Sequence, residues 1–159
     1  MSEAARVAAG AVTLVPAQPD DCRRLEPFVR AYHEFEHITS TPESRRLALQ
    51  QLLENAALGR IWLIEVSGEA VGYVALCFGY TIEFAGRDGF IDEFFITERH
   101  RGRGIGRQVL ERIADEARRC SVKALHLEVA RTNTAAARLY RAGGFVARER
   151  YHLMTQGLA

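Results

Sequence analysis

Residues 99–107 place three glycines and four arginines between a predicted strand and a predicted helix. Gly102, Gly104 and Gly106 leave the backbone bare, so that its N–H groups can approach a ligand closely. The arginines and the positive N-terminal end of the helix both favour a bound anion. The pattern predicts a pyrophosphate site, although a glycine-rich turn with solvated arginines would give a similar sequence.

Two common phosphate-binding motifs do not match this segment. A Walker A loop ends in Gly-Lys-Ser/Thr at the start of its helix, and no such triplet occurs here. The dinucleotide fingerprint requires a third glycine where Arg107 stands, and it opens the first βαβ unit of its fold. A nucleic-acid partner is not expected, because no aromatic residues alternate with the arginines and the net charge is only +1.

Hydrophobic periodicity predicts the elements that must position this loop. Strands are expected at residues 11–16, 61–66, 70–78, 89–96 and 124–129, with one or two more within 145–154. Helices are expected after Asp21, from Pro42 to near Gly59, and over residues 104–120 and 133–142. The order βααβββαβαβ(β) indicates an α/β fold, with a mixed β-sheet flanked by helices on both faces. Ligands bind such sheets where strand carboxyl ends meet helix N-termini, which directs attention to residues 96–106.

Length and composition indicate one domain. The 159 residues are 48% hydrophobic, close to the average of soluble chains. We expect residues 1–10 to form a flexible tail and residues 11–159 a single domain.

No apolar run reaches the roughly 20 residues that span a bilayer, and the N-terminus lacks the apolar core of a secretory signal. Three cysteines without a CxxC spacing or a Cys/His cluster predict buried reduced thiols, no metal site and a cytoplasmic location.

Two separated motifs resemble those of the GNAT superfamily of acetyl-CoA-dependent N-acetyltransferases. Residues Arg101–Gly106 match its Q/R-x-x-G-x-G/A signature, and Asn133–Phe145 match its N-x-x-A-x-x-L-Y-x-x-x-G-F segment. In that family the first motif wraps the pyrophosphate of coenzyme A. The likeness covers about residues 11–155. In addition, Asp92–Ile96 is similar to the corresponding stretch of diamine N-acetyltransferases. The resemblance implies a GNAT-like fold, acetyl-CoA as cosubstrate and no metal.

The resemblance also assigns cofactor contacts. The backbone of Phe94 and Ile96 would pair with the pantetheine arm like an added strand. Asn133 would hydrogen-bond the pantetheine or a phosphate, or only cap its helix. The residues expected to contact the cofactor are Phe94, Phe95, Ile96, Arg101, Gly102, Arg103, Gly104, Ile105, Gly106, Arg107, Asn133 and Ala136.

Acetylation of an amine benefits from a base and an acid. Only about one lysine-like amine in two thousand is unprotonated at pH 7, and the departing thiolate then needs a proton. The resemblance implies Tyr140 as the acid. Strand alternation lets only one of Asp92 and Glu93 face the cleft. We prefer Asp92 as the base, since it matches the carboxylate of the diamine-type enzymes. Glu93, which matches acidic residues of other GNAT proteins, is the alternative base, and a structural pairing of the carboxylate with an arginine such as Arg87 is the other interpretation.

Two acidic and aromatic segments, residues 32–37 and 80–84, are expected near the acceptor and suit a cationic amine with some apolar character. An ordinary solvated surface is the alternative. The substrate-binding candidates are Tyr32, Glu36, Tyr80 and Glu83.

The sequence thus predicts an N-acetyltransferase that uses direct transfer in a ternary complex. Its partner would be a small-molecule or peptide amine, without nucleic acid or membrane. The alternative function is a non-catalytic acyl-CoA-binding sensor, and the family likeness allows a homodimer through the C-terminal strands.

Overall fold

The computed structural model describes residues 11–158, so the tail predicted for residues 1–10 lies outside the described residues. The strands are β1 (Val12–Pro16), β2 (Gly59–Val66), β3 (Glu69–Thr81), β4 (Gly86–Ile96) and β5 (Ala124–Leu127). The helices are α1 (Cys22–Phe35), α2 (Pro42–Glu54), α3 (Ile105–Arg119) and α4 (Thr134–Ala142), and short 3-10 turns cover Pro19–Asp21 and Glu98–His100. Within residues 11–158, no helix combines the length and the apolar character needed to cross a membrane.

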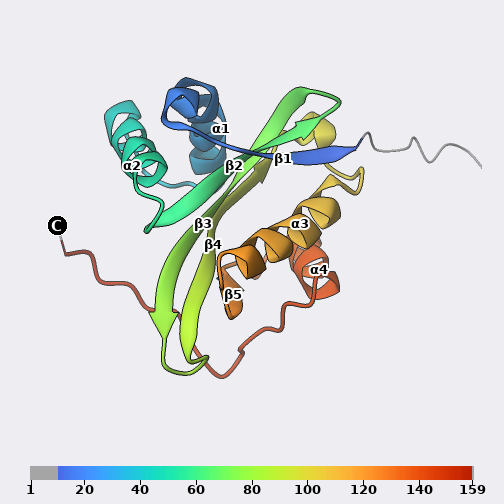
Figure 1. Ribbon diagram of the computed structural model, residues 1–159. Coiled ribbons are helices and arrows are strands. Elements are labelled where there is room, and N and C mark those ends of the chain that lie inside the picture. The colour runs from blue at the N-terminus through green and yellow to red at the C-terminus, as the bar shows by residue number, and fades with distance from the viewer. Residues whose placement is uncertain (1–10, 159) are drawn as a thin grey trace, which may run out of the picture.

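The strands form one sheet in the order β1-β2-β3-β4-β5, antiparallel from β1 to β4 and parallel between β4 and β5. Helices α1 and α2 cover one face of the sheet, and α3 and α4 cover the other (Figure 1). The parallel pair is connected through α3, as a crossover requires. The predicted α/β class, the mixed sheet and the two helical layers are confirmed.

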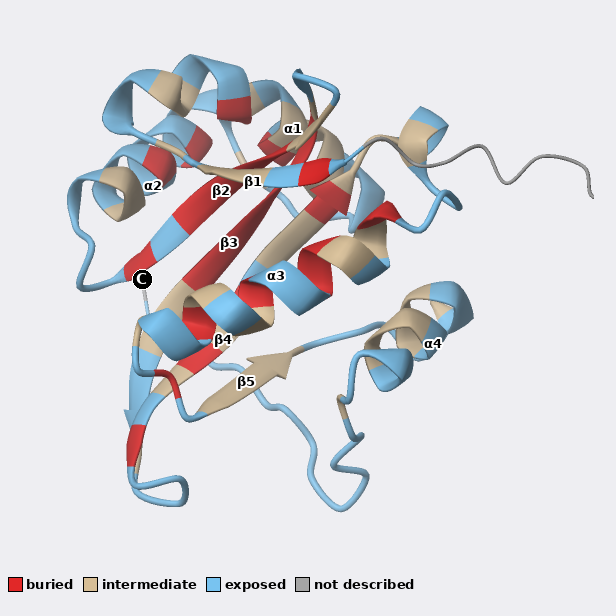
Figure 2. Ribbon diagram, turned by 45° about the vertical axis from the view of Figure 1, so that its right-hand side comes forward, coloured by how far each residue is buried: buried red, intermediate tan, exposed pale blue. Residues whose placement is uncertain are grey.

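The core has two halves because helices cover both faces of the sheet. Trp62 and Val109 belong to the half beneath α3, whereas Leu25 and Tyr73 belong to the half beneath α1 and α2. Figure 2 shows the buried positions concentrated on the central strands and on the inner side of α3. Burial on both faces explains why the central strands read as apolar runs rather than as an alternation.

Strand β4 carries a bulge at Asp92. The flanking residues Ile91 and Glu93 lie opposite consecutive residues of β3, which leaves Asp92 without a partner. The extra residue shifts the alternation along the strand, so that Ile91 packs toward α3 while Phe95 packs toward α1 and α2. The prediction that only one of Asp92 and Glu93 can face the cleft is therefore wrong, because it assumed an unbroken pleat. Both residues line the same cleft.

Strand β5 parts from β4 just before this bulge. The parallel pairing covers only Asp88–Ile91 with Ala124–Leu127, and β4 continues to Ile96. Figure 2 shows the arrow of β5 pointing away from β4 toward α4. The edge of β4 at residues 92–96 therefore has no strand pairing with it on the β5 side within the described chain, and it borders a cleft.

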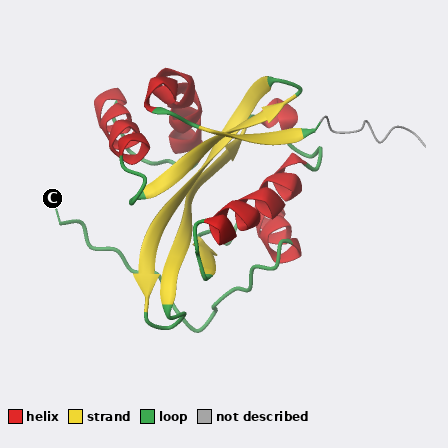
Figure 3. Cartoon of the chain, viewed as in Figure 1, coloured by secondary structure: helices red, strands yellow, loops and turns green. Residues whose placement is uncertain are grey.

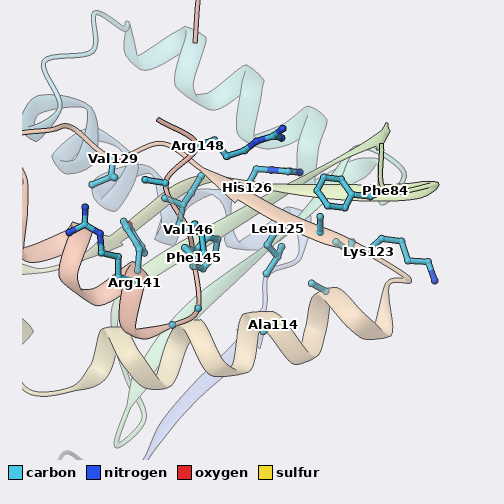
Figure 4. Close-up of a pocket in the computed structure, with 18 of the residues that line it drawn as sticks. Phe84, Ala114, Lys123, Leu125, His126, Val129, Arg141, Phe145, Val146 and Arg148 are labelled. Carbon is cyan, nitrogen blue, oxygen red and sulfur yellow. The ribbon is translucent and has the colours of Figure 1, made fainter. Parts of the chain in front are cut away.

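The predicted closing strands do not form: residues 143–158 contain no strand (Figure 3). An alternating pattern favours a strand, but a strand forms only where a partner edge supplies backbone hydrogen bonds. The segment instead crosses a groove between α3 and β5, where Phe145 and Val146 line the wall together with Leu125 (Figure 4). Arg148 then pairs with Glu83 of the β3–β4 loop at 3.0 Å.

Gly72 of β3 sets how closely β3 and β4 approach beside the cleft. A β-carbon at this position would lie 2.0 Å from the carbonyl oxygen of Phe95, which is a backbone atom and cannot move aside. We expect Gly72→Ala to lower the free energy of unfolding by about 3 kcal/mol, as overpacking does. In a thermal melt this would lower Tm by on the order of 10 °C. Gly157→Ala is the control, since a β-carbon there meets no atom within 4 Å; equal melting temperatures for the two variants would contradict the steric argument.

Candidate active site

A cleft of about 910 Å³ opens where β4 and β5 separate. Its walls come from α1, the free edge of β4, the loop at residues 100–107, the end of β5 and the first turns of α4. The glycine loop and the carboxylates predicted from the sequence therefore border one space. This is the position expected for a ligand site in a sheet of this type, at strand carboxyl ends and helix N-termini.

The glycines of the loop serve two different purposes. Gly102 and Gly104 have φ angles of 72° and 77°, a left-handed conformation that strains any residue with a β-carbon. Neither would contact another atom within 4 Å if it carried one, so their backbone lies uncovered. At Gly106, by contrast, a β-carbon would lie 2.9 Å from Cδ2 of Leu139, so this glycine lets α4 pack closely against α3.

The anion-binding capacity of the loop comes from its backbone and from two of its arginines. The first N–H groups of α3 have no intrahelical acceptor and carry the positive end of the helix dipole. Arg101 and Arg107 line the cleft, whereas Arg103 is exposed and lies outside the lining. Arg107 is held by Glu111, with 3.0 Å between its Nε and the carboxylate. These groups fit a pyrophosphate.

Arg101 also joins the loop to the opposite wall of the cleft. Its guanidinium lies 5.0 Å from the ring centre of Phe35 and 5.3 Å from that of Phe95. Its Nε donates a hydrogen bond of 2.8 Å to the carbonyl of Ile96. Stacking of this kind stabilises by about 0.5–1 kcal/mol per exposed pair. Arg101 thus connects the end of α1 with the glycine loop.

The two adjacent carboxylates have different surroundings. Both oxygens of Glu93 accept hydrogen bonds of 2.6 Å, one from the hydroxyl of Tyr73 and one from Nε2 of His33. Asp92 is exposed to the cleft and makes no side-chain hydrogen bond within the described chain. Partial desolvation by the walls, followed by repulsion from Glu93 and Glu128, raises the pKa of Asp92, against a lowering effect of His33. A carboxylate with these properties is suited to accept a proton.

Tyr140 reaches the same cleft from the second turn of α4. Its ring packs edge-on against Phe145, with 6.0 Å between the ring centres. Burial, followed by the negative charge of Glu36, raises the pKa of Tyr140. The phenol is therefore protonated at neutral pH and able to donate.

Asn133 caps α4: its Oδ1 accepts a hydrogen bond of 3.1 Å from the N–H of Ala136. The cap that the sequence analysis left open is thus present. Asn133 and Ala136 both line the cleft, and the cap uses only the oxygen of the Asn133 amide, which leaves its NH₂ group available as a donor.

The structure brings most of the predicted site residues together. Tyr32 and Glu36 line the cleft, whereas Tyr80 and Glu83 do not. Tyr80 is 78% exposed, and the β3–β4 hairpin carries both of the latter residues away from the cleft. Sequence reasoning missed the hydrogen-bond partners of Glu93. His33 was visible within an acidic and aromatic segment, but Tyr73 comes from the neighbouring strand and had no local signal.

A model of the acetyltransferase (GNAT) family matches residues 25–145. The chain belongs to the GNAT acetyltransferase family. An uncharacterized N-acetyltransferase of Archaeoglobus fulgidus is 32% identical over 130 residues, which cover 78% of this chain and 86% of that protein. Members of this family are acyltransferases that use acetyl-CoA, and this chain is accordingly an acyltransferase.

Solved structures share the fold of this GNAT protein. An integron cassette protein from the mobile metagenome of Cole Harbour Salt Marsh superimposes with a TM-score of 0.81 at 29% identity, over 92% of this chain and 90% of that chain. A predicted acetyltransferase from Clostridium acetobutylicum, solved with acetyl-CoA, superimposes with a TM-score of 0.74 at 19% identity, over 91% of this chain and 96% of that chain. The second likeness concerns the fold alone.

Gly104, which has a left-handed backbone conformation, allows a direct test of coenzyme A binding at the loop. We expect Gly104→Ala to weaken coenzyme A binding about ten-fold, because a β-carbon costs about 1–2 kcal/mol in this conformation and shifts the N–H groups at the start of α3. Calorimetric titration with coenzyme A measures the change. Gly157→Ala serves again as the control. Unchanged affinity of Gly104→Ala would mean that the loop does not need its left-handed backbone to bind.

Proposed function

We propose that this GNAT acyltransferase moves an acetyl group from acetyl-CoA to a primary amine by direct transfer in a ternary complex. The proposal rests on one observation: the candidate anion-binding loop and the candidate base and acid line the same cleft. The bare glycine loop with Arg101 and Arg107 lies at one end, and Asp92 and Tyr140 lie within the same walls. A pyrophosphate at the loop would leave its attached arm to run along the free edge of β4.

In the proposed reaction, Asp92 accepts a proton from the bound ammonium group. The free amine attacks the carbonyl carbon of the thioester, a C–N bond forms and the C–S bond breaks. Tyr140 donates its proton to the departing thiolate, and the nitrogen of the product releases its second proton, which restores the Tyr140 phenol and leaves a neutral amide. In this proposal a backbone N–H group on the unpaired edge of β4 stabilises the oxyanion of the tetrahedral intermediate, an interaction that contributes about 10²-fold or more in other acyl transfers.

The charges of the cleft favour a cationic acceptor. Glu36, Asp92, Glu93 and Glu128 line the cleft, and its cationic side chains belong to the loop segment at residues 100–107. Tyr32 adds an aromatic surface against which the carbon chain of an amine can pack. We therefore propose a small amine of net positive charge as acceptor, with a peptide amine as the second class.

An acyl-cysteine intermediate is not part of the proposal. The carboxylates of the candidate site affect the pKa of the Cys77 thiol. Burial, followed by repulsion from Asp92 and Glu93, raises the pKa of Cys77 to about 11. Its thiol is therefore protonated at neutral pH and is a poor nucleophile.

An amine library assayed for release of free coenzyme A thiol tests the proposal. We expect turnover with diamines or polyamines and weak turnover with neutral or acidic amino acids. A thermal shift by coenzyme A, run in parallel, distinguishes the alternatives. Stabilisation by coenzyme A without thiol release from any amine would support the acyl-CoA-binding sensor, and the absence of both would overturn the proposal.

A further inference from the structure

A chain of hydrogen bonds runs from the protein interior to the carboxylate of Glu93. Nε2 of His33 lies 2.6 Å from one oxygen of Glu93, and the hydroxyl of Tyr73 lies 2.6 Å from the other. The side chains of His33 and Glu93 are only 14% and 18% exposed. Two short hydrogen bonds in a largely enclosed position hold this carboxylate in one orientation.

The other ring nitrogen of His33 has its own partner. Nδ1 lies 2.8 Å from Oγ of Ser40, and this oxygen also accepts a hydrogen bond of 3.1 Å from Arg45. Arg45 is only 7% exposed and is held in turn by two hydrogen bonds to Glu26, of 2.9 and 3.1 Å. The position of Ser40 is therefore determined by a partly buried ion pair that lies outside the cleft.

The donor and acceptor requirements of this chain place a proton on Nε2 of His33. Arg45 can only donate, so Ser40 Oγ is its acceptor and the hydroxyl hydrogen of Ser40 is free to point at Nδ1 of His33. Because the ionised carboxylate of Glu93 can only accept, Nε2 of His33 carries a proton and donates it to Glu93. Tyr73 donates to the second oxygen of Glu93, so both oxygens of an ionised carboxylate are satisfied.

We propose that His33 is a positioning residue that fixes the Glu93 carboxylate beside Asp92, and that Ser40 and Arg45 hold the His33 ring in the orientation that presents Nε2 to Glu93. The proposal rests on the proposed function, because it assigns different roles to two carboxylates of the same site. Glu93 is held as a fixed negative charge, whereas Asp92, which has no such partners, is free to exchange a proton. Without His33, Glu93 would turn and the geometry around Asp92 would loosen.

The kinetic test compares two substitutions at the same position. Loss of a hydrogen bond to a charged, enclosed group should lower kcat by about ten-fold or more in His33→Leu. KM for acetyl-CoA should stay unchanged, because the loop lies elsewhere in the cleft. His33→Gln keeps an N–H near the position of Nε2 and should restore most of kcat. His126→Leu is the matched control, since His126 also lies near a carboxylate, 3.6 Å from Asp88, but outside the cleft.

Equal kcat values for His33→Leu and the wild type would overturn the proposal. A loss of activity that His33→Gln does not recover, with both variants melting like the wild type, would also overturn it, because the donated hydrogen bond would then not be the cause.

A spectroscopic test does not depend on activity. Long-range ¹H–¹⁵N correlation spectra of the labelled protein distinguish histidine tautomers, and the signal lost in His33→Gln identifies His33 among the five histidines. We expect a proton on Nε2 of His33 in the wild type, and a shifted His33 signal in Ser40→Ala, which loses the partner of Nδ1. A wild-type ring protonated on Nδ1 alone would overturn the proposed hydrogen bond to Glu93, and a signal unchanged in Ser40→Ala would overturn the role of Ser40. Failure of the proposed function appears differently, as wild-type protein that turns over no amine.

Discussion

Replacing Tyr140 with phenylalanine should lower kcat by about 10²- to 10⁴-fold, the range typical of a positioned general acid. The substitution removes only the hydroxyl, and the ring can keep its edge-on contact with Phe145. Because burial and Glu36 raise the pKa of Tyr140, the hydroxyl carries its proton at neutral pH and is available to the leaving thiolate. Steady-state kinetics with the best amine of the library measures the loss.

The affinity for coenzyme A separates catalysis from binding in this variant. Calorimetric titration of Tyr140→Phe with coenzyme A should match the wild type, since the loop at residues 100–107 is untouched. Tyr151→Phe is a suitable control, because Tyr151 is exposed and lies outside the lining of the cleft. Full turnover by Tyr140→Phe with normal binding would remove Tyr140 from the mechanism.

Asp92→Asn should cause a loss of comparable size, about 10²- to 10⁴-fold in kcat/KM at neutral pH. The amide has nearly the shape of the carboxylate but cannot accept a proton from the ammonium group. Asp115→Asn is the control, since Asp115 is an exposed aspartate of α3 that pairs with Arg118. Should Asp92→Asn retain its activity at neutral pH, the base must be another group or solvent.

The pH profile gives an independent check on this base. Partial desolvation, followed by repulsion from Glu93, raises the pKa of Asp92, while His33 opposes the shift. The base acts only when unprotonated, so kcat/KM should fall as the pH falls through this raised pKa, above the value near 3.9 of an ordinary aspartate. Glu93→Gln removes the negative neighbour and should move this acid limb to lower pH. An acid limb that stays in place would mean that the limb does not report Asp92.

Much of this site was readable from local sequence patterns. The glycines at 102 and 104 mark a left-handed loop because few other residues adopt that backbone, and the apolar stripe after them marks a helix that presents its N-terminus to the loop. The match to the second motif directed attention to Tyr140, and its helix does carry the phenol into the cleft. Such features depend on residues close together in the chain, so a local pattern is sufficient to find them.

Other features depend on contacts between distant segments, and only the folded chain decided them. The bulge that turns both Asp92 and Glu93 to one cleft arises from the register between β3 and β4. The hydrogen bonds that distinguish the two carboxylates come from Tyr73 and His33, which lie 20 and 60 positions away in the chain. The alternation within residues 145–154 favoured a strand, yet no partner edge pairs with it in residues 11–158. A sequence pattern predicts which face of a strand is buried, whereas the register and the pairing of that strand depend on where the other strands lie.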